Sequence, residues 1–209
     1  MKSLYFLDNN TGFISGHYSI YKTTNGGITW TIISTQTASY LDYFFVNPSV
    51  GIAATYDGAS YKNIWRTIDG GVTWLNVDSE ANYYINSVWF INENSGWAAG
   101  YYDQFGVSRE PAIFHTTDGG ITWQNIYLNH DVLARGEVLL DIRFKNELEG
   151  FAISDYTESI FTLDGGVTWT RTYDAESFGF PKLEGIYKTL SGDSELYLTG
   201  KNGYVVKWK

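Results

Sequence analysis

An eight-residue pattern that occurs four times constrains this chain more than any other feature. It reads Thr-x-Asn/Asp-Gly-Gly-Ile/Val-Thr-Trp and occupies residues 23–30, 67–74, 116–123 and 162–169. Successive copies begin 44, 49 and 46 residues apart. A period of roughly 40–50 residues in strand-like sequence is typical of β-propellers, in which each blade is a four-stranded sheet. The chain is therefore predicted to consist of successive copies of one β unit.

Each copy has the composition of a tight turn followed by a strand. Glycine adopts positive φ without steric cost, and an Asn or Asp side chain accepts hydrogen bonds from amides of its own turn. We interpret the residue before the glycines as structural rather than catalytic: Asn25, Asp69, Asp118 and Asp164. The tryptophans that end the copies are expected to pack between strands or blades: Trp30, Trp74, Trp123 and Trp169.

A second regular spacing precedes each turn and completes the unit. A phenylalanine is followed six residues later by a glycine: Phe6, Phe45, Phe90 and Phe144 with Gly12, Gly51, Gly96 and Gly150. The pattern predicts strands A and B, then strand C entering the Gly-Gly turn and strand D leaving it. The fold class is thus all-β, a five-bladed β-propeller of four-stranded antiparallel blades, with the last blade short of its outer strand.

We expect a single domain over 1–209, with blades at about 1–35, 36–79, 80–128, 129–174 and 175–209. No Gly-Gly-x-Thr-Trp follows the fifth unit, so its edge is expected to be open. Closure of the ring would rest on packing between blades, on a partner subunit or on residues outside this sequence. Oligomerisation through the open edge is therefore one expectation, and a fragment or half of a larger propeller is an alternative interpretation.

Composition excludes several functions. A formal charge of −9 disfavours nucleic acid and anionic membranes as partners, and no apolar run is long enough for membrane insertion. The chain has no cysteine, so disulfides and thiol catalysis are excluded, and its three histidines lack the spacing of a zinc site. No cofactor motif is present, so we expect no metal and no cofactor. No signal peptide is visible in residues 1–10, and the sequence leaves the compartment undecided.

Loop lengths vary on one face of the expected blades. The A–B and C–D turns have constant length, whereas the B–C and D–A loops vary, and both emerge at the same end of a blade. Insertions confined to one face usually mark the binding face of a repeat protein, and tyrosines among charged groups suit a sugar or an extended peptide. The alternative is that the tyrosines pack on one another and cap the blades. The candidate binding residues are Tyr56, Asp57, Tyr83, Tyr84, Tyr101, Tyr102, Asp103, Arg109, Arg135 and Tyr156.

The repeated octapeptide resembles the Asp-box, also called the bacterial neuraminidase repeat. The Ser-Gly-Trp-Ala-Ala-Gly stretch at 95–100 and His-Thr-Thr-Asp-Gly-Gly at 115–120 resemble the Ycf48-like photosystem assembly factors and their bacterial relatives. The resemblance implies a propeller in which the boxes are peripheral turns, and it favours an extracytoplasmic location. Asp-boxes also occur in sialidases, xyloglucan-active glycosidases and sortilin-type receptors. The chain lacks the Phe/Tyr-Arg-Ile-Pro stretch that sialidases carry.

These observations favour a non-catalytic recognition or assembly module that binds a protein or a glycan on the B–C and D–A loop face. The alternative is a glycan-active hydrolase of the Asp-box type. Such an enzyme needs two carboxyl groups roughly 5–9.5 Å apart. Several acidic residues could supply the pair, and the sequence does not choose among them: Asp57, Asp103, Glu110, Asp131, Glu137, Asp141 and Asp155.

Overall fold

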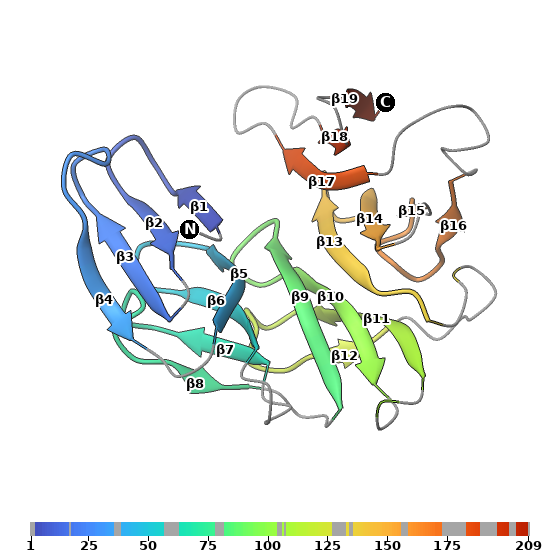
Figure 1. Ribbon diagram of the computed structural model, residues 1–209, viewed down its shortest axis with the longest axis horizontal. Helices are drawn as coiled ribbons and strands as arrows, with labels where there is room; N and C mark the ends of the chain where they lie inside the picture. Colours follow the sequence, from blue (N-terminus) through green and yellow to red (C-terminus); the bar gives the residue numbers. More distant parts are fainter. Residues whose placement is uncertain are drawn as a thin grey trace.

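A computed structural model of the chain describes residues 3–16, 18–35, 39–56, 63–77, 82–103, 106, 108–126, 133, 136–155, 159–172, 183–188, 196–200 and 204–208. These residues form nineteen strands in five antiparallel sheets (Figure 1). Among them, no helix is long and apolar enough to cross a membrane. The described part of the chain is all-β and built of antiparallel sheets, which confirms that part of the predicted fold class; the number of blades stays a prediction.

Strands that neighbour one another in a sheet are consecutive in sequence. Sheet 1 contains β1 (Ser3–Phe6), β2 (Gly12–Ser15), β3 (Ser19–Thr23) and β4 (Thr31–Thr35). Sheet 2 contains β5 (Ser39–Phe45), β6 (Gly51–Tyr56), β7 (Ile64–Thr67) and β8 (Leu75–Asn76). Sheet 3 contains β9 (Tyr83–Phe90), β10 (Gly96–Asp103), β11 (Arg109–Thr116) and β12 (Gln124–Asn125). Sheet 4 contains β13 (Leu139–Phe144), β14 (Gly150–Ser154), β15 (Ser159–Thr162) and β16 (Thr170–Arg171). Sheet 5 contains β17 (Leu183–Lys188), β18 (Leu196–Gly200) and β19 (Tyr204–Trp208).

The repeated Phe and Gly are cross-strand partners at the A–B turn. Phe90 pairs with Gly96, and the same register joins each of the other three phenylalanines to its glycine. The phenylalanine ring lies directly over the glycine, because a Cβ on Gly96 would be 2.6 Å from the Phe90 ring. The six-residue spacing thus has a packing cause, since only glycine leaves room for the ring.

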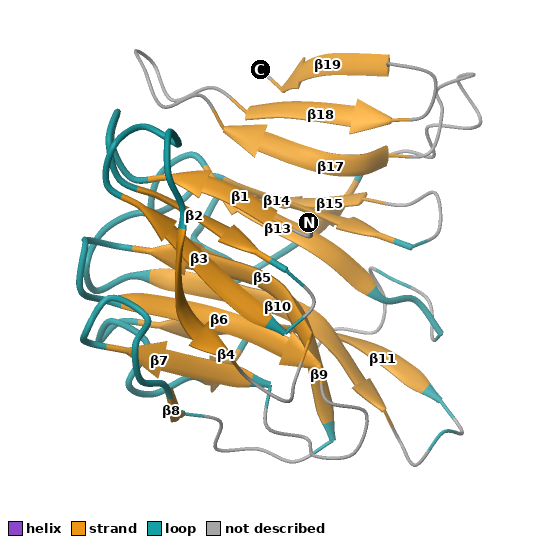
Figure 2. Ribbon diagram, turned by 60° about the vertical axis from the view of Figure 1, so that its left-hand side comes forward, coloured by secondary structure: helices purple, strands orange, loops and turns teal. Residues whose placement is uncertain are grey.

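The five sheets follow one another along an arc (Figure 1). The first strands β1, β5, β9, β13 and β17 lie on its inner side, each packed beside the next, and the last strands lie on its outer side. Sheet 1 and sheet 5 are at the two ends. The A–B and C–D turns gather at one end of the sheets (teal, left in Figure 2), so the variable loops leave from the opposite end.

Apolar side chains fill the space between successive sheets. Ile20 of sheet 1 packs with Tyr43 and Ala53 of sheet 2, and equivalent clusters join sheets 2 to 3, 3 to 4 and 4 to 5. Leu133 comes from the connection between sheets 3 and 4, and the other buried residues of each cluster come from strands or turns of two neighbouring sheets. The hydrophobic core is therefore a series of interfaces rather than one central body.

The Gly-Gly turns are closed by their own side chains. In the third copy, Asp118 Oδ1 accepts hydrogen bonds from the amides of Ile121 and Thr122 at 3.0 and 2.9 Å, and the hydroxyl of Thr116 accepts from the Gly120 amide at 2.9 Å. Both glycines of every copy have φ between 70° and 95°. The indole N–H of Trp30, Trp74 and Trp169 donates to the carbonyl of the second glycine of its own turn. The four acidic or amide residues and these tryptophans thus sit in turn geometry; Trp123 is buried beside Phe90 without such a bond among the described residues.

Candidate functional site

The structure brings four of the candidate binding residues together at the loop end of sheets 2 and 3. Tyr56 ends β6, Tyr84 and Tyr101 face each other across β9 and β10, and Arg109 begins β11. Tyr84 and Tyr101 stack with ring centroids 5.0 Å apart and planes 14° apart. Tyr56 lies 5.8 Å from Tyr84, and the Arg109 guanidinium lies 5.3 Å from the Tyr101 centroid. We call these four residues the tyrosine row.

Two other candidate tyrosines lie on the opposite face of sheet 3. Tyr83 and Tyr102 are cross-strand partners with ring centroids 5.0 Å apart, and Tyr83 packs edge-on against Phe114. The Tyr83 hydroxyl also accepts a hydrogen bond from Asn125 at 3.1 Å. Successive side chains on a strand point to opposite faces. Tyr83 and Tyr102 are therefore directed to the packing between sheets 2 and 3, away from the tyrosine row.

Carboxylates surround the row. Burial raises the pKa of Tyr101, the charge of Arg109 opposes that rise, and the charges of Asp103 and Asp155 add to it. Asp103 is the cross-strand partner of Arg109 and accepts a hydrogen bond from the Gly106 amide at 2.7 Å. Asp155 accepts a hydrogen bond from the Val138 amide at 2.9 Å. The predicted residues Asp57, Arg135 and Tyr156 lie outside the described residues.

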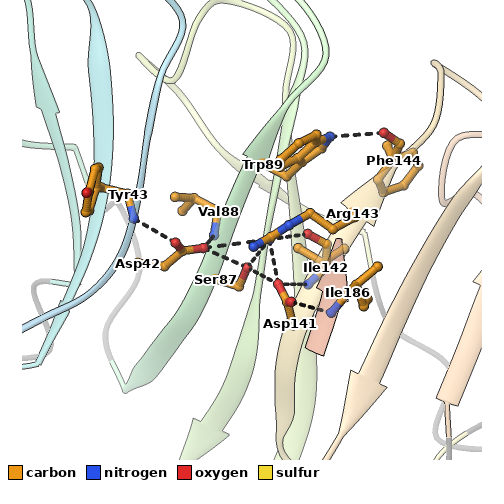
Figure 3. Close-up of polar contacts among 10 residues, drawn as sticks. All are labelled: Asp42, Tyr43, Ser87, Val88, Trp89, Asp141, Ile142, Arg143, Phe144 and Ile186. Atoms are coloured by element: carbon orange, nitrogen blue, oxygen red, sulfur yellow. Dashed lines mark hydrogen bonds and ion pairs between the residues drawn. The ribbon is translucent and has the colours of Figure 1, made fainter. Parts of the chain in front are cut away.

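A second polar cluster joins the inner strands (Figure 3). It contains Asp42 of β5, Ser87 of β9, and Asp141 and Arg143 of β13, and we call it the inner-strand cluster. The guanidinium of Arg143 lies 2.5 Å from Asp141 Oδ1, 3.7 Å from Asp42 Oδ2 and 2.8 Å from the Ser87 hydroxyl. It also lies 5.0 Å from the Trp89 ring, which makes a cation–π contact.

The Ser87 hydroxyl lies between the two carboxylates, 2.9 Å from Asp42 and 2.8 Å from Asp141. With one hydrogen, it donates to one of them at a time. Burial raises the pKa of Asp141; Arg143 lowers it and the neighbouring charge of Asp42 raises it further.

Both carboxylates of the cluster also bind backbone amides of the following sheet. Asp42 of sheet 2 accepts from Val88 of sheet 3, and Asp141 of sheet 4 accepts from Ile186 of sheet 5, each at 3.1 Å (Figure 3). The cluster therefore connects four successive inner strands. Asp141 was among the candidate carboxylates of the sequence, whereas Asp42, Ser87 and Arg143 were missed. Asp42, Ser87 and Asp141 each stand three residues before the repeated phenylalanine, and this shared offset was the signal that could have found them.

Metal-ligating groups do not gather in the described ranges, where no three His, Asp or Glu residues lie close enough to hold an ion. His115 stacks on Trp97 with centroids 4.7 Å apart, and its Nε2 lies 3.1 Å from the Ser95 hydroxyl. Burial lowers the pKa of His115. This histidine is held as a packing residue of strand β11.

Comparison with known proteins identifies the repeated Gly-Gly turn as an Asp-box. The BNR/Asp-box repeat matches at residues 114–125, which include the third octapeptide. The chain carries an Asp-box repeat. No curated protein matches the sequence. Among solved structures, this Asp-box chain is similar to YCF48 from Cyanidioschyzon merolae, with a TM-score of 0.69 and 17% identity over 99% of this chain and 68% of that one.

The same fold occurs in an enzyme. The GH74 xyloglucanase from Xanthomonas campestris matches with a TM-score of 0.67 and 10% identity, over 90% of this chain and 33% of its own length. The Asp-box chain thus spans about a third of that hydrolase. A structure of YCF48 bound to D1 peptide matches with a TM-score of 0.47 and 13% identity, over 98% of this chain and 91% of that one. The two matches with TM-scores of 0.69 and 0.67 establish a β-propeller type of fold and, at 17% and 10% identity, nothing beyond the fold.

Proposed function

We propose that this protein is a non-catalytic recognition module whose five sheets are propeller blades and whose B–C and D–A loop face binds a polypeptide segment. The tyrosine row is the observation that carries this proposal. It places three aromatic rings and a guanidinium in successive contact, with Tyr84 and Tyr101 stacked and Tyr56 tilted against Tyr84, at the end of the sheets where the loops vary in length.

The packing of the row favours a polypeptide over a glycan. A sugar ring binds an aromatic side chain by lying on its flat face, whereas Tyr84 and Tyr101 cover one another and Arg109 covers Tyr101. The polar groups of the row can still bind a ligand, since tyrosine hydroxyls donate or accept hydrogen bonds and a guanidinium binds carboxylates. Arg109 is exposed, and Tyr56 is 45% exposed. These groups match the carbonyl and carboxylate groups of an extended peptide.

The absence of catalysis is part of the proposal. A glycosidase needs one carboxyl group to donate a proton while the other faces the sugar or its water. Asp42 and Asp141 both contact the Ser87 hydroxyl and both bind an amide of the next sheet. Asp141 is also paired with Arg143 at 2.5 Å. The proposal therefore gives this pair a structural role in joining sheets rather than a role in hydrolysis.

A phage-displayed library of random peptides tests the proposal directly. Peptides selected on the wild-type chain are expected to lose about tenfold or more in affinity for the Tyr56→Ala/Arg109→Ala variant, the size of effect typical of central contact residues. Leu148→Ala is the control, because Leu148 is a 58% exposed residue in the A–B turn between β13 and β14, at the end of the sheets opposite the loop face. Equal binding by both variants would contradict the proposed face.

A glycan array, read for both retention and cleavage, separates the alternatives. Retention that the same double variant abolishes would replace the peptide by a sugar as ligand. Release of reducing ends by the wild-type chain would overturn the non-catalytic assignment.

A further inference from the structure

Three charged side chains at the tyrosine row form no ion pair with any residue in the described part of the chain. Asp103 and Arg109 are direct cross-strand partners on β10 and β11, and Asp155 follows β14 of the next sheet. The ion pairs that the described residues do form lie elsewhere, within the inner-strand cluster and between Lys145 and Glu149. The row therefore presents one positive and two negative charges to a ligand.

The two carboxylates at the row differ from those of the Asp-box turns in the use of their oxygens. Both oxygens of Asp118 accept hydrogen bonds from groups of its own turn. Asp103 accepts from the Gly106 amide at Oδ1, and Asp155 accepts from the Val138 amide at Oδ1. The second oxygen of each carboxylate has no hydrogen-bond donor among the described residues. Both side chains are half-buried, so cationic N–H groups of a ligand can take the place of water at these oxygens.

A short segment before β13 connects the three charges. The Gly136 amide donates to the Arg109 carbonyl at 2.8 Å. Two residues later, the Val138 amide donates to Asp155 at 2.9 Å. Two extended residues span at most about 7 Å, so the Arg109 carbonyl and the Asp155 carboxylate are no more than about 13 Å apart. Alternate side chains of an extended peptide point the same way and lie about 7 Å apart, so a few residues of ligand can reach all three charges.

Charge complementarity selects the chemistry of that ligand. Arg109 lies 5.3 Å from the Tyr101 ring centroid, and its exposed guanidinium has no hydrogen-bond acceptor within the described ranges. It is therefore suited to bind a carboxylate of the ligand. The two carboxylates at the row and the formal charge of −9 repel a purely acidic segment, while Arg109 repels a purely basic one. A segment with charges of both signs is complementary to all three groups.

We infer that the polypeptide segment bound at the tyrosine row carries a basic residue, held by Asp103 and Asp155, and an acidic residue two positions away, held by Arg109. This inference rests on the proposed function and adds the chemistry of the bound segment to it. The stacked rings of the row then support the segment, and the three charges fix its register.

Peptides selected from the phage library on the wild-type chain provide the first test. They are expected to share a Lys or Arg two positions from an Asp or Glu. Asp103→Asn and Asp155→Asn each remove a charge but keep the Oδ1 acceptor of the backbone amide, and each is expected to weaken binding about two- to fivefold at low salt. Asp8→Asn is the matched control, because Asp8 Oδ1 likewise accepts from backbone amides and lies in the A–B turn of sheet 1, opposite the loop face.

A double-mutant cycle on a synthetic copy of one selected peptide tests the contact itself. Replacing its basic residue by glutamine should weaken binding to the wild type and have less effect on Asp155→Asn, because the charge that it met is gone. If Tyr56→Ala/Arg109→Ala loses the peptides while Asp103→Asn and Asp155→Asn bind them as tightly as the wild type, the inference is wrong and the proposed function stands. If the library yields no peptide that binds the wild type, both are overturned. Circular dichroism of each variant separates loss of binding from loss of folding.

Discussion

At the scale of single residues, the Asp-box turn depends on an ionised carboxylate. Asp69 accepts hydrogen bonds from the hydroxyls of Thr67 and Thr73 at 2.7 and 2.5 Å and from the Thr73 amide at 2.9 Å. The bonds from Thr73 and Thr67 lower the pKa of Asp69 from 3.8 to about 2. The folded state thus holds its proton less tightly than the unfolded state does.

This shift predicts a loss of stability in acid. Because the folded pKa is the lower one, the contribution of Asp69 is complete above about pH 5 and is lost as the pH falls towards 2. We expect the free energy of unfolding of Asp69→Asn, measured by urea titration, to fall less steeply between pH 4 and pH 2 than that of the wild type. The first copy of the octapeptide shows that the turn accepts an amide, since Asn25 bonds Thr29 through both its oxygen and its nitrogen. Identical slopes for variant and wild type would contradict the prediction.

At the scale of strands, the contact between Phe90 and Gly96 sets the A–B pairing. A methyl group at Gly96 would lie 2.6 Å from the ring, so we expect Gly96→Ala to lower the free energy of unfolding by about 1–3 kcal/mol through overpacking. Gly16→Ala is the control, because its Cβ would meet no atom closer than 3.6 Å. Urea unfolding measures both, and equal effects of the two substitutions would show that the ring contact is not the cause.

The sequence predicted strands and turns well because their signals are local. The Phe and Gly spacing and the Gly-Gly turns specify strand pairing over a few residues. The sequence could not tell which tyrosines share a face of sheet 3. Tyr83 and Tyr84 are adjacent and point to opposite faces, and a bulge in β9 and β10 shifts the alternation of side chains. For the inner-strand cluster, the shared offset from the phenylalanines marks equivalent positions, but the contact between Asp42 and Ser87, 45 residues apart, forms only when sheets pack.

Arg143 of sheet 4 lies close to two carboxylates, Asp42 of sheet 2 and Asp141 of its own sheet, and offsets their negative charge. We expect Arg143→Met to lower the free energy of unfolding by about 3–5 kcal/mol near pH 7, because Asp42 and Asp141 then face each other without a cation. Loss of the cation raises the folded pKa of Asp141 further, so its protonated form favours the folded state. The difference from the wild type should therefore shrink as the pH is lowered towards 4.5. Urea titrations of both proteins at the two pH values provide the check, and a difference independent of pH would contradict this account.

At the scale of the whole molecule, stability is distributed as a row of interfaces with two open ends. Sheets 2, 3 and 4 each pack on both faces, whereas sheet 1 and sheet 5 each pack on one. In such an array each unit is stabilised by its immediate neighbours, and units with fewer interfaces open more readily. We therefore expect amide hydrogen exchange to be slowest in β9, β10, β13 and β14 and fastest in β1 to β4 and β17 to β19 in dilute solution. Uniform protection of all five sheets in dilute solution would contradict this expectation.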